Sequence, residues 1–89
     1  MMVVLDYGER RHIKIEVYSC KDEFFEIKEA SYALIKQQET IPEDEGTCNI
    51  YNHVMDIVLE PKRRGEYKLL VTYNIADEIL IEKAKVVVI

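Results

Sequence analysis

The 89-residue chain has no tryptophan, two cysteines, three isolated glycines and no long apolar run. Two cysteines are too few for a disulfide scaffold, and neither has a Cys or His at metal-ligand spacing. We expect Cys20 and Cys48 to be partly buried thiols, and a disulfide between them is the alternative in an oxidising compartment. Isolated glycines exclude a Gly-rich phosphate loop. No stretch approaches the ~20 apolar residues of a membrane span.

The charge balance is acidic, with 17 Asp and Glu against 12 Lys and Arg, a net charge of −5. This balance argues against general nucleic-acid binding, which requires a basic face. The length and the 48% hydrophobic fraction indicate one globular domain over residues 1–89. The N-terminal MMVVLDYGERR lacks a basic region before its apolar residues, so we expect no signal peptide and a location that is cytoplasmic or in a particle assembled there.

Apolar and polar residues alternate along much of the chain, which is typical of half-buried strands. The apolar positions of three such segments are Ile13, Ile15 and Val17; Met55, Ile57 and Leu59; and Tyr67, Leu69, Val71 and Tyr73. Cys48 and Ile50 alternate in a further short strand, and VVL near the N-terminus forms another. Turns are expected at 21–23, Asn52 and Ala76–Asp77, and QETIPEDEG (38–46) is expected to be a loop.

Two segments change phase. The inward positions Phe25 and Ile27 give way to Ala30 and Leu34, which predicts a β-bulge near Lys28–Glu29. A helix is the rival interpretation of this segment, because Glu, Lys and Ala are good helix formers. The last segment, EILIEKAKVVVI, shifts phase near Lys83–Ala84, so a bend or bulge is expected there as well.

About seven strands without a convincing helix predict an all-β sandwich or small barrel. The stretch Gly65-Glu66-Tyr67 favours the immunoglobulin-like (Greek-key) sandwich, in which a tyrosine near the start of the sixth strand bonds back to the preceding loop. Gly65 and Tyr67 would form this tyrosine corner. Leu69 would then take the position of a disulfide cysteine, and Tyr32 that of the tryptophan. The chain departs from antibody domains in having no tryptophan and no cysteine pair on the expected strands.

Residues 24–89 read F-x-I-x-x-A-x-Y-x-L, an acidic loop, G-T-C-x-I, and then G-x-Y-x-L-x-V-T-Y-x-I-x-x-E-I. This succession resembles small immunoglobulin-like domains encoded by phages and prophages, including those of tail and baseplate proteins. The resemblance implies a structural role in a virion or its assembly, without chemistry. It supplies no functional residues, because such domains act through surfaces.

No catalytic set of acid, base and nucleophile is visible, and we expect no cofactor and no metal. His12 and His53 are interpreted as surface histidines. The acidic cluster Glu43, Asp44 and Glu45 lacks the ligand spacing of an EF-hand loop, so a solvated loop is expected rather than a calcium site. The basic run Lys62, Arg63 and Arg64 is too short to indicate nucleic-acid binding.

In a Greek-key sandwich these two clusters would lie at the same end, together with residues 9–11. The other end would hold residues 21–23, 52–53 and 77–78. The clusters are either ordinary solubility charge or a docking surface for a partner or a second copy. The terminal run Val86–Ile89 is expected either to be covered as a core strand or to pair with another chain.

The sequence therefore predicts a non-enzymatic structural or protein–protein interaction domain, with a protein partner or a second copy of the chain, and with no nucleic-acid or membrane partner. A bacterial adaptor or regulatory module outside virions is the alternative. A carbohydrate-binding module would require exposed aromatic residues on one concave face, and the candidates are Tyr7, Tyr18 and Tyr51.

Overall fold

The computed structural model describes residues 1–18 and 24–89, and within these residues every regular element is a strand. The strands are β1 (Met2–Leu5), β2 (Arg11–Glu16), β3 (Ile27–Lys36), β4 (Asp44–Thr47), β5 (Asn49–Tyr51), β6 (Val54–Leu59), β7 (Gly65–Ile75) and β8 (Glu78–Val88). The prediction of an all-β fold is confirmed, with eight strands where about seven were expected. Within the described part of the chain, no helix has the length and apolar character needed to cross a membrane.

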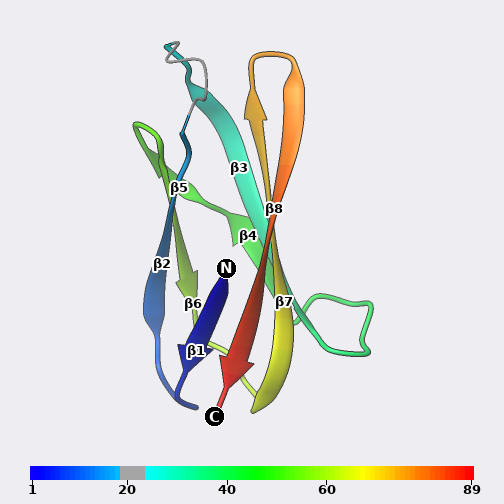
Figure 1. The fold of residues 1–89 in the computed structure, drawn as a ribbon. Coiled ribbons are helices and arrows are strands. Elements are labelled where there is room, and N and C mark those ends of the chain that lie inside the picture. Colours follow the sequence, from blue (N-terminus) through cyan, green and yellow to red (C-terminus); the bar gives the residue numbers. More distant parts are fainter. Residues whose placement is uncertain (19–23) are drawn as a thin grey trace.

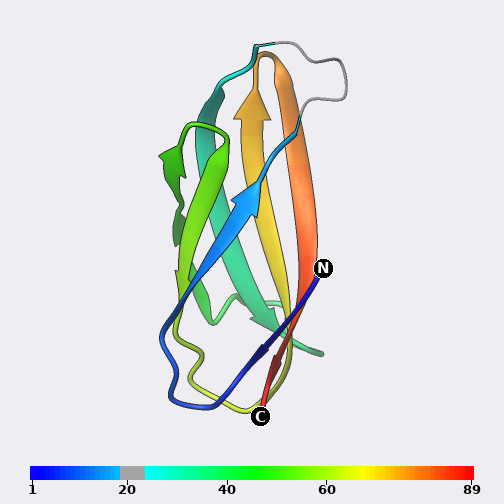
Figure 2. The same cartoon turned by 60° about the vertical axis from the view of Figure 1, so that its left-hand side comes forward.

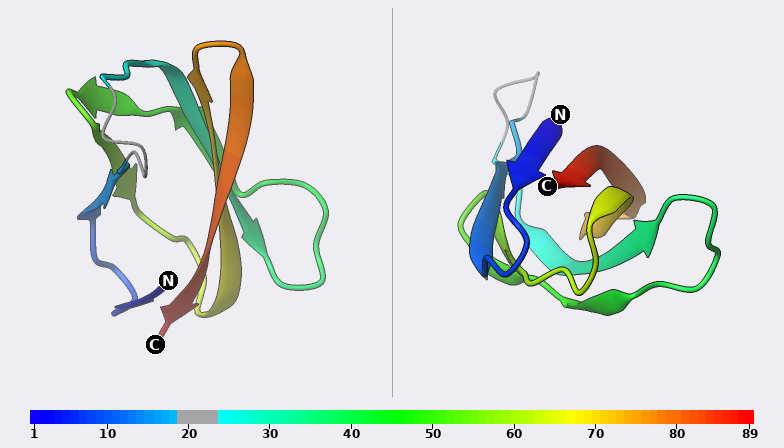
Figure 3. Two further views of the ribbon diagram at one scale, coloured as in Figure 1. Left: turned by 45° about the horizontal axis from the view of Figure 1, so that its top comes forward. Right: turned by 90° about the horizontal axis from the view of Figure 1, so that it is seen from below.

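The strands form two sheets that pack face to face as a sandwich (Figures 1 and 2). The larger sheet has the order β1-β8-β7-β3-β4, and the smaller has the order β2-β6-β5. Within the larger sheet β1 runs parallel to β8, and the other neighbouring strands are antiparallel. The end-on view in Figure 3 shows the two layers and the β3–β4 loop, which projects away from the sandwich.

The core lies between the sheets and is filled by alternate residues of both. Its fully buried large side chains are Leu5, Leu34, Met55, Ile57, Leu59, Leu69, Val71 and Val86. Leu34 and Leu69 are direct cross-strand partners at its centre. Burial of one such side chain stabilises the fold by about 1.5–3 kcal/mol. The predicted inward faces around Ile13, Met55 and Tyr67 are confirmed.

The predicted bulge is present at the start of β3. The register between β3 and β7 shifts between Ile27 and Glu29, so that Ile27 and Ala30 both point into the core. Antiparallel pairing with β7 excludes the helical alternative, because tertiary pairing outweighs the helix propensity of Glu, Lys and Ala. The left-handed backbone of Asn52 and Ala76, with φ of 54° and 53°, lies at two of the predicted turns.

The expectation of a loop over residues 38–46 was wrong at its C-terminal part. Asp44–Thr47 forms β4 and pairs with Ser31–Leu34 of β3. Gly46 lies opposite Tyr32, and a Cβ atom there would stand 3.4 Å from the tyrosine ring. The chain then crosses to the smaller sheet at Cys48, which is buried and whose amide donates to the carbonyl of Ala30. The short strand that follows therefore begins at Asn49.

The expected irregularity near Lys83–Ala84 was also wrong. The pairing of β7 with β8 runs without a shift from Gly65 opposite Val88 to Ile75 opposite Glu78. The inner positions of β8 are therefore the even-numbered ones, and Ile79 and Ile81 lie on the outer face. The change of phase in the sequence arises because the exposed Ile79 and Ile81 are as apolar as the buried Val86 and Val88.

The C-terminal run is a covered strand. Val86 and Val88 are buried, and β1 pairs with residues 85–88 of β8 on the side away from β7. The amide of Ile89 donates to the carbonyl of Leu5, which extends this parallel pairing to the end of the run. Pairing of this run with another chain, the other expected outcome, is blocked because β1 occupies its edge. Cys20 and the predicted turn at 21–23 lie outside the described residues, and so does the question of a Cys20–Cys48 bridge.

Candidate functional site

Tyr67 joins the two predicted charged clusters at one end of the sandwich. Its hydroxyl oxygen lies 3.0 Å from the carbonyl oxygen of Arg63 and 2.9 Å from each carboxylate oxygen of Glu43. Gly65 begins the strand with a φ of 123°, and a Cβ there would stand 2.9 Å from Lys36 Nζ. Only glycine adopts this conformation readily, so Gly65 permits the turn that Tyr67 closes. Burial raises the pKa of Tyr67 to about 12, and the Glu43 carboxylate contributes to the shift.

Glu43 is the centre of this cluster, and the expectation of a solvated acidic loop was wrong for it. Its side chain is 9% exposed and accepts hydrogen bonds from the Lys62 amide at 3.0 Å and Arg63 Nε at 2.9 Å. Burial alone would raise the pKa of Glu43, but these bonds and the one from Tyr67 outweigh it, so the pKa is lowered. The carboxylate therefore stabilises the fold.

Arg63 is paired within the chain and offers no free charge to a partner. Its guanidinium donates to both carboxylate oxygens of Glu39, at 2.8 and 3.0 Å, in addition to Glu43. The acidic and basic loops thus lie at the same end, as predicted, but they neutralise each other. The remaining members of the predicted surface are dispersed: Arg64 stacks on the Tyr7 ring at 4.5 Å, Asp44 accepts from Tyr32, and Glu45 and Lys62 are exposed.

Both histidines have partners in the fold. His12 Nδ1 lies 3.1 Å from both carboxylate oxygens of Asp56, a residue that is 8% exposed and that the sequence did not single out. His53 is half-buried, its Nε2 lies 3.0 Å from the carbonyl oxygen of Phe25, and the two rings stack at 3.9 Å. His53 is thus a partly exposed turn residue whose ring is held by the fold. Across residues 1–18 and 24–89, no group of three or more His, Cys, Asp or Glu side chains could hold a metal ion.

The outer face of the larger sheet, formed by the side chains of β3, β7 and β8 that point away from the core, is the most distinctive surface. Ile79 and Ile81 are 71% and 58% exposed there. Leu70 of β7 lies on the same face, opposite Lys83 of β8, and is half-exposed. Large apolar side chains grouped on an exposed face are typical of a contact surface. The sequence did not reveal this face, because the alternation in residues 78–89 changes phase and only the register with β7 places Ile79 and Ile81 outside.

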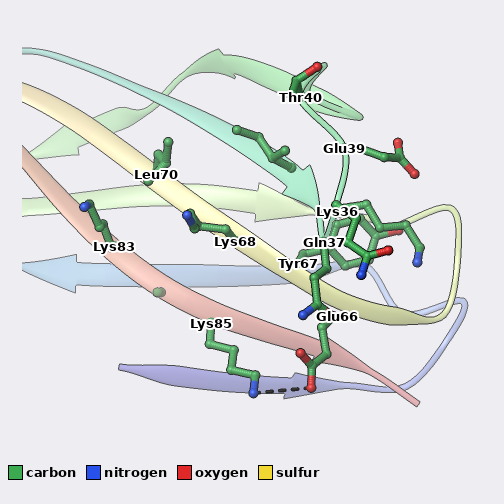
Figure 4. A pocket seen from close by; sticks show the side chains of 13 residues that line it. Lys36, Gln37, Glu39, Thr40, Glu66, Tyr67, Lys68, Leu70, Lys83 and Lys85 are labelled. Carbon is green, nitrogen blue, oxygen red and sulfur yellow. Dashed lines mark ion pairs between the residues drawn. The ribbon is translucent and has the colours of Figure 1, made fainter.

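A groove of about 590 Å³ lies on this face under the β3–β4 loop (Figure 4). Leu70 and Ile35 contribute its apolar surface, and Lys68, Lys83 and Lys85 line it from β7 and β8. Residues 36–40 form the opposite wall. We call this hollow the lysine groove. Figure 4 shows the side chains of Leu70, Lys68 and Lys83 lying together along these two strands.

Two further hollows continue the lysine groove along β7. The first, of about 370 Å³, shares Leu70 with it and extends to Thr72. The second, of about 610 Å³, shares Thr72 with the first and extends to Asn74 and Ile79. The three hollows together form an elongated depression, which we call the trough.

The lysine groove is basic although the chain is acidic. Lys68 lies directly opposite Lys85, and Lys83 lies opposite Leu70. Lys85 Nζ is 3.3 Å from a carboxylate oxygen of Glu66, and this pair is marked by the dashed line in Figure 4. Four lysines, at 36, 68, 83 and 85, line the groove together with two glutamates, at 39 and 66. Glu39 is already bound by Arg63, so the groove carries an excess of positive charge.

The exposed tyrosines do not form one platform. Tyr7 lies beside Arg64 and donates its amide to the carbonyl of Ile89, at the end of the sandwich where β8 finishes. Tyr51 lies at the opposite end, next to the Asn52–His53 turn. Tyr18 follows the end of β2 near this turn, and its hydroxyl donates to Glu16. This dispersion gives no support to a carbohydrate-binding face. No protein-family model, no curated protein and no solved structure matches the chain.

Proposed function

We propose that this chain is a non-enzymatic, immunoglobulin-like interaction domain that binds a partner protein through the outer face of its larger sheet. The observation that carries the proposal is the trough on that face, with Ile79 and Ile81 exposed beside it. Apolar centres with charged margins are typical of protein contact surfaces.

The strand order supports the immunoglobulin-like part of the proposal. Immunoglobulin sandwiches place strands B, E and D in one sheet and strands C, F and G in the other, and variable-type domains add C′. The order β2-β6-β5 corresponds to B-E-D, and the order β8-β7-β3-β4 corresponds to G-F-C-C′. The bond from the Tyr67 hydroxyl to the Arg63 carbonyl has the place of a tyrosine corner, near the start of strand F.

The non-enzymatic part is supported by the engagement of the ionisable groups. Asp56 binds His12, Phe25 binds His53, and Glu43 accepts bonds from three donors. A general acid or base needs to reach a substrate proton, whereas these groups serve the fold.

A quantitative capture experiment tests the binding face. Leu70→Asp places a carboxylate opposite Lys83 on the outer face of the larger sheet. The matched variant Val58→Lys places an ammonium two residues from Asp56, on the outer face of the smaller sheet. Each new charge lies near a charge of opposite sign, so both variants should fold. The proposal predicts that one set of proteins captured by the wild type disappears with Leu70→Asp and persists with Val58→Lys; the reverse pattern would refute it.

The setting that we propose is a phage or prophage particle or its assembly, and the resemblance of residues 24–89 to phage-encoded domains supports it. Mass spectrometry of particles purified from the producing bacterium tests this setting. The chain should be present in the particles at a fixed ratio to the other virion proteins. A chain found only in the particle-free extract would instead support the adaptor or regulatory module.

A further inference from the structure

We propose that the trough binds an extended, acidic segment of the partner protein, with the carboxylates of that segment over Lys68 and Lys83. The inference rests on the proposed function, because it names the chemistry that the outer face of the larger sheet recognises. The charge, the shape and the apolar surface of the trough each contribute to it.

The charge of the lysine groove favours an anionic occupant. Lys68 and Lys85 are direct cross-strand partners, and like charges so placed destabilise a sheet. Glu66 is the carboxylate that pairs with Lys85 in the described part of the chain, and Lys68 and Lys83 have no ion-pair partner there. A ligand carboxylate over these two lysines would remove the repulsion and form charge-assisted hydrogen bonds.

The shape of the trough suits an extended chain. It follows β7 from Lys68 to Asn74, a span of about 20 Å at the usual rise of a strand. An extended segment of about six residues has that length. The trough is basic at the Lys68 end, and Leu70 and the exposed Glu45 line its middle. Its Asn74 end carries the exposed Ile79 together with one charge of each sign, Lys28 and Glu29, and so has no excess of positive charge. We therefore expect acidic residues at one end of the bound segment and apolar residues at the other.

A nucleic acid fits the trough less well than a polypeptide. Single-stranded nucleic acids are bound by stacking on exposed aromatic rings. Of the two aromatic residues in the trough lining, Tyr67 is buried in the core and Tyr32 is partly buried against it. The net charge of −5 also repels a polyanion, whereas a short acidic segment carries few charges.

Fluorescence anisotropy with two labelled hexapeptides tests the inference. The probes are Glu-Glu-Glu-Val-Thr-Val and its reverse, which cover both chain directions, and the control peptide has Lys in place of Glu. We expect one acidic probe to bind, to bind more weakly as salt rises, and to bind more tightly than the lysine peptide. The double variant Lys68→Glu/Lys83→Glu should weaken binding by at least about tenfold.

The charge-matched control is Arg10→Glu/Lys62→Glu, two exposed residues outside the trough. It should bind the acidic probe as the wild type does. No binding of either acidic probe, equal binding by the two double variants, or displacement of the probe by a tighter-binding oligonucleotide would each overturn the inference. So would self-association of the chain in light scattering that the Lys68→Glu/Lys83→Glu change abolishes, because the occupant would then be a second copy.

The two proposals fail separately. Loss of captured proteins with Leu70→Asp, combined with no binding of either acidic probe, would overturn the acidic segment and leave the binding face intact. Persistence of every captured protein with Leu70→Asp would overturn the binding face itself.

Discussion

Lys68 and Lys85 face each other directly across β7 and β8, on a surface that points away from the core. Cross-strand pairs of like charge destabilise a sheet, and pairs of opposite charge contribute roughly 0.2–1 kcal/mol of stability. An acidic chain with 17 carboxylates has thus placed lysines together where a carboxylate would make the fold more stable. The proposed binding of an anionic partner would explain this arrangement, since functional surfaces often carry features that stability alone would not select.

The variant Lys68→Glu separates stability from binding. The new carboxylate would lie opposite Lys85, so we expect the free energy of unfolding to rise by up to about 1 kcal/mol. Binding of the acidic probe should fall in the same variant. Urea unfolding and anisotropy on one protein sample measure both quantities. A variant that is less stable and also binds less would indicate a general loss of structure instead.

Tyr67→Phe removes the hydroxyl that bonds Arg63 and Glu43 and retains the buried ring. We expect a loss of about 1–3 kcal/mol in the free energy of unfolding, because the Glu43 carboxylate loses a donor while it stays buried. The matched control Tyr51→Phe removes an exposed hydroxyl and should change stability little. Equal effects in the two variants would show that the hydroxyl of Tyr67 has no special role.

The fall in the free energy of unfolding at acidic pH should depend on Glu43. Its pKa is lowered in the fold, so its contribution is fully present above the unfolded value of about 4.3 and is lost as the pH falls through the folded pKa. The variant Glu43→Gln has no ionisable group at position 43, so it lacks this pH dependence. Denaturant unfolding from pH 7 to pH 3 should therefore show the wild type losing its advantage over this variant below about pH 4.3.

Glu39→Gln is the control for that measurement. Hydrogen bonding to Arg63 lowers the pKa of Glu39 as well, but its side chain is 43% exposed, so solvent screens the pair. Glu39→Gln should therefore change the pH dependence of the free energy of unfolding less than Glu43→Gln does. A constant difference between wild type and Glu43→Gln over the whole pH range would contradict the prediction.

Cys48 should be an unreactive thiol in the native protein. Burial, with a contribution from the nearby Asp56 carboxylate, raises the pKa of Cys48 to about 11. In a Cys20→Ser variant, reaction of Cys48 with a disulfide reagent at pH 8 should be slower than in the urea-unfolded chain by more than about tenfold. Equal rates before and after unfolding would mean that the sheet crossing at Cys48 opens readily.

The elements that the sequence predicted are those with a local signal. The bulge before Ala30 is visible as a change of phase, and Gly65 followed by Tyr67 indicates both the turn and the residue that closes it. Each of these features depends on a few neighbouring residues, which is why the pattern alone sufficed.

The elements that it missed depend on contacts between distant segments. Asp44–Thr47 has poor strand propensity and forms β4 only because the edge of β3 is available. Ile79 and Ile81 are apolar enough for a core, and only the register with β7 places them on the outer face. The lysine groove requires three strands and a loop to be assembled, so no single stretch of sequence indicates it.

Site-specific photo-crosslinking in the producing cells tests the central claim most directly. A photoreactive phenylalanine analogue replaces Leu70, on the outer face of the larger sheet, or Val58, on that of the smaller sheet. We predict a discrete adduct with another protein from position 70 and none from position 58. An adduct from position 58 alone would contradict the account and place the binding surface on β2, β6 and β5.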